Sequence, residues 1–218
     1  MQLKHILLGL VISLFFGCAG SYLKDATVVN PEKRGYDKIL IIAKAKDKTA
    51  RSRFENQVVN DLALNGIEAS SSMSVLKTDS FSKELSDEDL DRLKQQMIAD
   101  GFDGVIITNL INVEQYTEVQ QGGLSSTYMP VSYGRFGRYY RYYPVTYWEP
   151  DEISTGYEYT LESCLYDITL PDENLQWVGR FKIKDPSSLK RTIEKYSQDL
   201  TAALLEQSIA LSLENKKF

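Results

Sequence analysis

Two short apolar runs, residues 38–43 and 103–111, stand out in the pattern of hydrophobic and polar positions along the chain. Both are rich in β-branched side chains and lack regular polar alternation, which is typical of strands that are buried on both faces of a sheet. A third run, residues 67–76, is diluted by four serines. It predicts a strand at the edge of the same sheet.

Two segments between these runs follow the spacing of amphipathic helices. From Thr49 onward apolar side chains recur at intervals of four, and Asn65-Gly66 ends the segment with a glycine that adopts left-handed backbone angles at little cost. Ser86, followed by three acidic residues, predicts the start of a second helix. We expect its buried side to hold Leu90, Leu93 and Met97. The order strand, helix, strand, helix, strand predicts parallel pairing with right-handed crossovers.

The C-terminal part of the chain predicts a hairpin and a final helix. Residues 156–170 and 176–184 are strand-like and are joined by the turn-forming sequence Pro171-Asp-Glu-Asn174. After Ser188 a helix is predicted whose apolar side consists of Leu189, Ile193, Tyr196, Leu200 and Leu204. We therefore predict an α/β fold, a two-layer or three-layer sandwich with a mixed sheet of about five strands and three helices.

The segment 120–150 differs in composition from the rest of the chain. It holds seven of the fourteen tyrosines, one of the two tryptophans and three arginines, and it has no acidic residue before Glu149. Aromatic rings bury a large area at low entropic cost, and guanidinium groups stack on rings and bind anions. We predict an aromatic hairpin insert over residues 116–152 of the α/β domain.

The N-terminus has the features of a secretory signal. Lys4 precedes an apolar run, residues 6–16, that is too short to span a bilayer comfortably. The segment Leu14-Phe-Phe-Gly-Cys18 resembles the lipobox of bacterial lipoproteins. That resemblance implies cleavage before Cys18 and its acylation; an uncleaved anchor and an ordinary secreted protein are the alternatives. Ala19 replaces the aspartate of inner-membrane lipoproteins, so we expect anchoring on the periplasmic face of the outer membrane, with surface display as the alternative.

These patterns divide the chain into segments of different character. We expect a signal peptide over residues 1–17, a polar tether over 18–37, one α/β domain over 38–210 that carries the insert 116–152, and a charged tail over 211–218.

The residue types that are missing restrict the chemistry. The only histidine, His5, belongs to the signal, so the mature chain has no Ser-His or Cys-His nucleophile and lacks the commonest zinc ligand. No phosphate-binding glycine loop and no Cys-x-x-Cys pair occurs, and we expect neither a cofactor nor a metal. Acylation of Cys18 would leave Cys164 without an intramolecular partner, and we expect it to be a buried apolar filler. The net charge of −5 gives no reason to expect nucleic acid as a partner.

Two local matches carry little weight. Ser74-Val-Leu-Lys77 fits the S-x-x-K pattern of serine acyl-transferases, but three other Ser-Lys pairs fit equally well and Ser74 is predicted on a strand. Asp100 and Asp103 provide too few oxygens for calcium and are interpreted as parts of a turn.

The stretches KILIIAKAKDKTARSRFENQVVNDLALNGIEA, ADGFDGVIITNLINV and ESCLYDITLPDENLQWVGRF together resemble a class of poorly characterised bacterial lipoproteins. The layout is similar to the N-terminal domain of the Tol-Pal translocation protein and to lipoprotein activators of penicillin-binding proteins. This resemblance implies an interaction module more than an enzyme, although a fold is no proof of function.

We expect a non-catalytic lipoprotein that binds or scaffolds an envelope partner, a protein or peptidoglycan, through the insert. An insert that packs on its own domain or has no partner, and one that contacts a membrane surface or lipopolysaccharide, are alternatives. So are a structural subunit of an oligomeric envelope assembly and, less favoured, a carboxylate-only hydrolase. The expected partner-binding residues are Tyr133, Arg135, Phe136, Arg138, Tyr139, Tyr140, Arg141, Tyr142, Tyr143, Tyr147 and Trp148.

Overall fold

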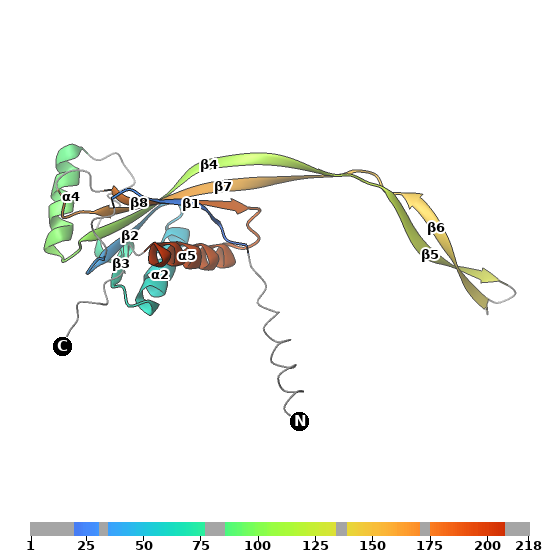
Figure 1. The fold of residues 1–218 in the computed structure, drawn as a ribbon, viewed down its shortest axis with the longest axis horizontal. Helices are drawn as coiled ribbons and strands as arrows, with labels where there is room; N and C mark the ends of the chain where they lie inside the picture. The colour runs from blue at the N-terminus through green and yellow to red at the C-terminus, as the bar shows by residue number, and fades with distance from the viewer. Residues whose placement is uncertain (1–19, 31–34, 77–85, 134–138, 171–174, 208–218) are drawn as a thin grey trace, which may run out of the picture.

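The computed structural model describes residues 20–30, 35–76, 86–133, 139–170 and 175–207, and these form a six-stranded sheet, a separate two-stranded sheet and four helices (Figure 1). The main sheet has the order β1-β8-β7-β4-β2-β3. Its strands are β1 (Leu23–Val28), β2 (Ile39–Lys44), β3 (Ala69–Ser71), β4 (Gly104–Gln120), β7 (Glu152–Asp167) and β8 (Leu175–Lys184). The second sheet pairs β5 (Leu124–Tyr133) with β6 (Tyr139–Trp148). The helices are α2 (Lys48–Leu64), α3 (Ser72–Val75), α4 (Asp87–Ala99) and α5 (Leu189–Glu206).

The main sheet is mixed, as the sequence predicts. β2 runs parallel to both β3 and β4, whereas the pairs β4–β7, β7–β8 and β8–β1 are antiparallel. The two apolar runs therefore lie side by side in the centre, with Ile41 opposite Ile106. The predicted α/β fold with an aromatic hairpin insert is confirmed, with one more strand and one more helix than expected.

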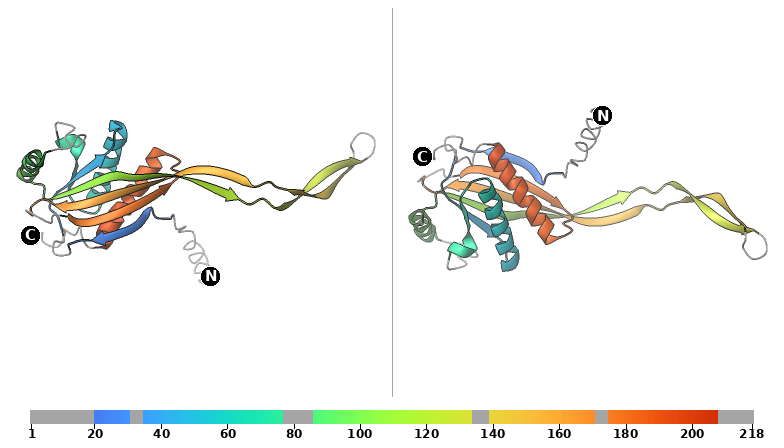
Figure 2. Two further views of the ribbon diagram at one scale, coloured as in Figure 1. Left: turned by 90° about the horizontal axis from the view of Figure 1, so that it is seen from above. Right: turned by 90° about the horizontal axis from the view of Figure 1, so that it is seen from below.

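Helices cover the two faces of the sheet unequally (Figure 2). α2 and α5 pack on one face, where Trp177, Phe181 and Tyr196 are fully buried and the rings of Phe181 and Tyr196 lie 4.4 Å apart. α4 packs on the other face through Leu93 and Met97, against Leu40, Ile42 and Val105. The alternate residues of β2 thus face different cores, which explains why its sequence is apolar throughout.

Helix ends follow the local sequence signals. The side chain of Ser86 accepts a hydrogen bond from Asp89 N, and that of Ser188 accepts one from Arg191 N, so both serines are N-caps. α2 ends at Leu64 with Asn65 as its C-cap, and Gly66 follows with a φ of 75°. No helix in the described parts of the chain is both long and apolar enough to cross a membrane.

Three sequence predictions differ from the structure. Residues 23–28 of the expected tether form β1, which pairs with β8 through backbone hydrogen bonds; an edge strand needs no continuous apolar pattern, so its polar side chains hid it. Leu90 and Leu189 are exposed rather than buried, because each lies in a first helical turn that extends past the packed part of its helix. Ser74 lies on α3 and not on a strand.

Candidate functional site

The most conspicuous feature of the structure is a long two-stranded arm (residues 112–160) that projects from the helices and the remaining strands (Figures 1 and 2). β4 and β7 continue past the end of the sheet, and residues 112–120 of β4 pair with residues 152–160 of β7. Beyond them the β5–β6 hairpin extends the arm further. The aromatic segment is therefore a hairpin, as predicted, but its stem is made by the core strands themselves.

The stem of the arm has two chemically different faces. Val113, Val119, Ile153 and Tyr157 are each 47% exposed or more and lie on one face, which has no charged side chain and also carries Gln115, Thr117 and Thr155. The other face carries Glu114, Glu118, Glu152 and Glu158. Because side chains alternate along a strand, this apolar face is the continuation of the face that α2 and α5 cover in the domain. The arm thus exposes the same kind of surface that the domain buries.

A set of contacts fixes the arm where it leaves the domain. The Asp185 carboxylate accepts hydrogen bonds from the hydroxyl of Tyr116 and, at 2.9 Å, from Tyr157 N. Gly156 lies against both Tyr116 and Asp185, and a Cβ atom there would collide with them. The Lys184 ammonium lies 4.1 Å from the centre of the Tyr116 ring and 3.3 Å from a carboxylate oxygen of Glu118. Sequence reasoning did not identify these residues.

A local signal for this contact did exist in the sequence. Asp185 follows β8 directly and has a φ of 44°, a left-handed conformation that aspartate tolerates better than most residues. An aspartate between a strand and a proline is a common turn signal. Its two partners on the arm, however, are 69 and 28 residues away, and only the fold brings them together.

The predicted partner-binding residues are distributed over the β5–β6 hairpin. Trp148 is 67% exposed and pairs with Leu124, which is also exposed, and Tyr147 donates a hydrogen bond to Glu149. In the strand register Tyr133 is opposite Tyr139, and Tyr140, Arg141, Tyr142 and Tyr143 follow along β6. Arg135, Phe136 and Arg138 lie outside the described residues, as does the expected lipidation site Cys18.

A pocket of about 410 Å³ lies at the root of the arm. Its walls come from the N-terminal halves of α2 and α5, from the carboxyl ends of β2 and the domain part of β4, and from β7 and β8. The carboxyl ends of parallel strands are where open α/β sheets commonly bind ligands. Side chains that line the pocket include Phe54, Leu110, Leu161, Ile183, Leu189 and Ile193.

Two hydroxyl groups of the pocket lining are engaged in hydrogen bonds to the same serine. The hydroxyls of Thr108 and Tyr196 both bond to Ser163 Oγ, at 2.6 and 2.9 Å. Burial raises the pKa of the Tyr196 phenol, so this group stays neutral. Two cationic residues, Lys44 and Arg51, line the pocket, and no carboxylate among the described residues does. The pocket therefore gives no support to a carboxylate hydrolase.

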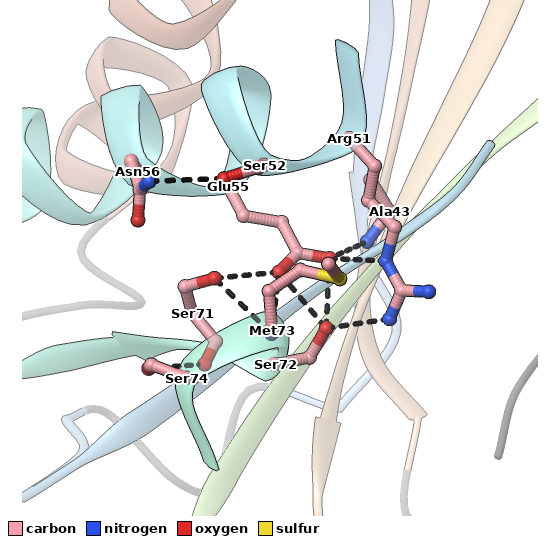
Figure 3. Close-up of polar contacts among 9 residues, drawn as sticks. All are labelled: Ala43, Arg51, Ser52, Glu55, Asn56, Ser71, Ser72, Met73 and Ser74. Atoms are coloured by element: carbon pink, nitrogen blue, oxygen red, sulfur yellow. Dashed lines mark hydrogen bonds and ion pairs between the residues drawn. The ribbon is translucent and has the colours of Figure 1, made fainter. Parts of the chain in front are cut away.

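One side of the pocket is backed by a buried polar cluster (Figure 3). The Glu55 carboxylate is completely buried and accepts hydrogen bonds from Arg51 Nε at 2.9 Å, Ala43 N at 2.9 Å and Ser71 Oγ at 2.7 Å. It also accepts from Ser72 Oγ and from Met73 N. Arg51 in turn donates to Ser72 Oγ at 2.8 Å. The cluster joins α2, β2 and the β3–α3 corner, and we interpret it as structural.

The weaker sequence candidates have structural roles. Ser74 Oγ donates to Ser71 O, and its proposed partner Lys77 lies outside the described residues. Asp103 accepts hydrogen bonds from Asp37 N and Lys38 N, which ties the starts of two strands together. Within the described ranges no group of three or more histidine, cysteine, aspartate or glutamate residues is placed to hold a metal ion.

Cys164 is free and only 7% exposed, as expected of a buried filler. Burial raises the pKa of its thiol, and the nearby Glu162 carboxylate raises it further. A thiol of this kind is a poor nucleophile at neutral pH.

No family model and no curated protein matches the chain. Among solved structures it is similar to PelC from Paraburkholderia phytofirmans, described as a dodecamer, in two crystal forms. One has 11% identity over 86% of this chain and 98% of that chain with a TM-score of 0.43, and the other has 12% identity over 86% and 96% with a TM-score of 0.41. A PDZ domain protein from Parabacteroides distasonis has 10% identity over 85% of this chain and 35% of that chain, with a TM-score of 0.35. These likenesses are too distant to bear on function.

Proposed function

We propose that the chain is a membrane-anchored, non-catalytic lipoprotein that binds or scaffolds an envelope partner, a protein or peptidoglycan, through the Tyr/Arg-rich arm. Anchoring through acylated Cys18 on the periplasmic face of the outer membrane belongs to this proposal and rests on the sequence. The observation that carries it is the exposed apolar face of the arm, from Val113 to Ile153.

Physical arguments connect this face to binding. A two-stranded ribbon is at best marginally stable in water unless its apolar side packs against something. Within the described residues no helix or third strand covers the arm beyond the domain. Large exposed apolar patches mark interaction sites on soluble domains. At the far end of the arm, Trp148 and the tyrosines of β6 are the residue types that dominate binding hot spots.

The test compares point variants on opposite faces of the stem. Ile153→Asp places a charge on the apolar face, whereas Ser154→Asp places the same charge on the other face one residue away. Crosslinking pull-downs from envelopes should lose the partner with Ile153→Asp and retain it with Ser154→Asp. A crosslinked product that disappears on muramidase treatment identifies peptidoglycan as the partner.

A second variant removes the distal arm without disturbing the stem. Gln120 and Glu152 are register partners, so residues 121–151 can be replaced by a two-residue Asn-Gly turn. No residue of the two buried clusters lies in this segment, so the domain should keep its unfolding midpoint. If the shortened chain retains every crosslink of the natural chain, the Tyr/Arg-rich hairpin does not bind the partner, and if Ile153→Asp also retains every crosslink, the whole proposal is wrong.

One observation favours a second candidate, a structural subunit of an oligomeric envelope assembly. In the described chain the arm part of β4 pairs only with β7, and residues 152–157 of β7 pair only with β4. Both strands therefore offer unpaired backbone groups that another chain could extend. Light scattering after size exclusion of the non-acylated chain (Cys18→Ser) distinguishes the two candidates, because a monodisperse monomer excludes the oligomer.

A further inference from the structure

The residue before β1 is fixed against α5. Tyr22 N donates a hydrogen bond to the Asp199 carboxylate at 2.6 Å, and Tyr22 O accepts one from Lys182 N at 2.8 Å. The Lys195 ammonium lies 5.0 Å from the centre of the Tyr22 ring. Because Asp199 and Lys195 belong to α5, the chain enters the domain beside this helix, on the face of the sheet that α2 and α5 cover.

This position limits how far the domain can lie from a membrane anchor at Cys18. Cys18 precedes Tyr22 by four residues, and an extended chain spans about 3.5 Å per residue, so the two are at most about 14 Å apart. The attraction of a charged surface extends over a Debye length of about 8 Å at physiological salt. An acylated Cys18 would therefore keep α5 beside the lipid headgroups, and the face around Tyr22 would lie closest to them.

The charges of α2 and α5 are separated along the helices. The N-terminal halves, residues 48–56 and 189–198, hold six basic and two acidic residues, a net charge of +4. The C-terminal halves, residues 57–64 and 199–206, hold three acidic residues and no basic one. Neither helix has an acidic residue in its first turn, although the helix dipole favours one there. The exposed and half-exposed cations of the N-terminal halves, which form the basic surface, are Lys48, Arg53, Lys190, Arg191 and Lys195.

Two arginines of the basic surface point away from the sheet. Arg53 and Arg191 are exposed, whereas Phe54 and Ile193, close to them on the same helices, are buried in the core. Within the described residues neither arginine takes part in an ion pair. Lys195 follows Arg191 by one helical turn and lies on the same side of α5. The two arginines are therefore accessible to an anionic partner.

The other cations of α5 are only weakly engaged. Lys190 and Lys195 pair with Glu194 and Asp199 of the same helix, at 3.7 and 3.4 Å. The Lys190 side chain is 81% exposed, and an exposed pair of this kind contributes little. Its ammonium can therefore exchange this carboxylate for a phosphate group.

The opposite side of the sheet has the reverse charge. α4 holds four acidic and two basic residues, and its Glu88 and Asp91 are exposed. An anionic surface thus attracts the side of α2 and α5 and repels the side of α4. The distribution of charge favours one orientation of the domain on such a surface.

We propose that the basic surface docks on the anionic phospholipid bilayer that holds the Cys18 anchor. This proposal rests on the anchoring proposed above, but not on the arm or its partner. Basic residues beside a lipid anchor add to its hold on the bilayer, and each lysine or arginine close to anionic headgroups strengthens binding about fivefold. The bilayer thereby fixes which side of the domain turns toward it.

The experiment measures vesicle binding without the anchor. The processed chain, residues 18–218 with Cys18→Ser, contains every described residue. It should cosediment with vesicles of phosphatidylglycerol and phosphatidylcholine, but not with phosphatidylcholine alone, and high salt should release it. Absence of a preference for phosphatidylglycerol overturns the proposal.

Two double variants locate the surface. Arg53→Glu/Arg191→Glu should lower the vesicle partition coefficient at least about tenfold. Arg92→Glu/Lys182→Glu changes the net charge equally, but on α4 and on the other face of β8, and should lower it much less. All four positions are exposed, so equal unfolding midpoints are expected. Equal losses of binding in the two variants would contradict the proposal.

Other occupants of the surface give different results. Binding that is lost in Ile153→Asp and retained in Arg53→Glu/Arg191→Glu would place the membrane contact on the arm and overturn the proposal. Self-association without vesicle binding, abolished by Arg53→Glu/Arg191→Glu, would assign the basic surface to a second copy and also overturn it. If labelled palmitate is not incorporated at Cys18, the anchoring is wrong, whereas a missing lipid preference refutes the docking surface alone.

Modification of lysines tests the orientation of the anchored chain. On phosphatidylglycerol vesicles an amine-reactive reagent should modify Lys190 of the acylated chain several-fold more slowly than on phosphatidylcholine vesicles. Lys182, on the other side of the sheet and with its side chain 43% exposed, should react at the same rate on both. Equal rates for Lys190 on the two kinds of vesicle would show that this side does not face the bilayer.

Discussion

At the scale of single residues, Glu55 shows how one buried charge organises several elements. Its carboxylate accepts hydrogen bonds from the backbone of β2, from Arg51 on the same helix and from the serines of the β3–α3 corner. A buried ion pair contributes little net stability over an apolar substitute, because both charges lose their hydration. Removal of one partner alone is costly, since the other charge is then buried without compensation. The cluster therefore fixes the position of β3 and α3 relative to β2 and α2.

Glu55→Ala should lower the free energy of unfolding by about 3–5 kcal/mol because it removes the buried carboxylate that lies 2.9 Å from the Arg51 guanidinium and compensates its charge. The double variant Arg51→Met/Glu55→Ala should recover a large part of that loss, since no charge then remains in the cluster. Urea denaturation followed by circular dichroism measures both. Glu206→Ala, at an exposed position of α5, serves as the control and should change stability by less than about 0.5 kcal/mol. Equal losses in the single and double variants would contradict this account.

At the scale of elements, the arm is an extension of core strands rather than a loop attached to them. The stem is in register with the sheet through β4 and β7, with an irregularity between Leu110 and Asn112 where the strands leave the domain. Asp185, at the end of β8, holds the stem at that point through Tyr116 and Tyr157. Together with the contacts of Lys184 with Tyr116 and Glu118, this contact limits the hinge motion of the ribbon at its root.

Asp185→Ala should loosen the root of the arm, because it removes the acceptor for two hydrogen bonds from the stem. Each such bond contributes about 0.5–1.5 kcal/mol, so amide hydrogen exchange in residues 112–118 and 154–160 should become about tenfold faster. Asp185→Asn keeps an acceptor and tolerates the left-handed backbone angle, and should exchange at close to the natural rate.

The distal junction offers a matched control for this experiment. Asp151 accepts a hydrogen bond from Gly122 N at 2.8 Å, at the far end of the stem. Asp151→Ala should accelerate exchange there and leave the root unchanged. The same exchange pattern in both alanine variants would show that Asp185 has no specific role in holding the arm.

At the scale of the whole molecule, two buried tyrosines and the half-buried Tyr166 make the stability of the domain depend on pH in the alkaline range. Burial raises the pKa of Tyr166 to about 12. It also raises the pKa of Tyr36 and of Tyr196, which come from different parts of the fold. The folded state thus holds these protons more tightly than the unfolded chain, whose tyrosines titrate near 10.

The free energy of unfolding should therefore be insensitive to these groups below about pH 10 and should fall as the pH rises from about 10 toward 12. Tyr166→Phe removes one of the titrating groups and should make this fall shallower. Denaturant titrations at a series of pH values measure the effect. An unchanged slope in Tyr166→Phe would mean that its phenol does not retain its proton in the folded state.

Much of the fold could be predicted because the decisive signals are local. The continuous apolar run of β2, the four-residue spacing of Phe54, Val58 and Leu62, and the N-caps Ser86 and Ser188 depend on neighbouring residues only. Such spacings follow directly from the backbone geometry of strands and helices, so they identify these elements. The composition of residues 120–150 likewise indicated a hairpin of unusual chemistry before its geometry was known.

The features that matter most for function depended on contacts between distant residues. β1 exists because Ala26 meets Gly179, the arm is held because Asp185 reaches Tyr116, and the pocket forms because α2 and α5 pack beside each other over the same strands. None of these contacts can be recognised from the spacing of residues along the sequence. Each joins residues that are far apart in the chain or that belong to separate elements. The sequence alone determined the central strands, the three longer helices and the chemistry of the insert. Only the tertiary structure decided that the insert stands on an amphipathic stem, with an apolar pocket at its root.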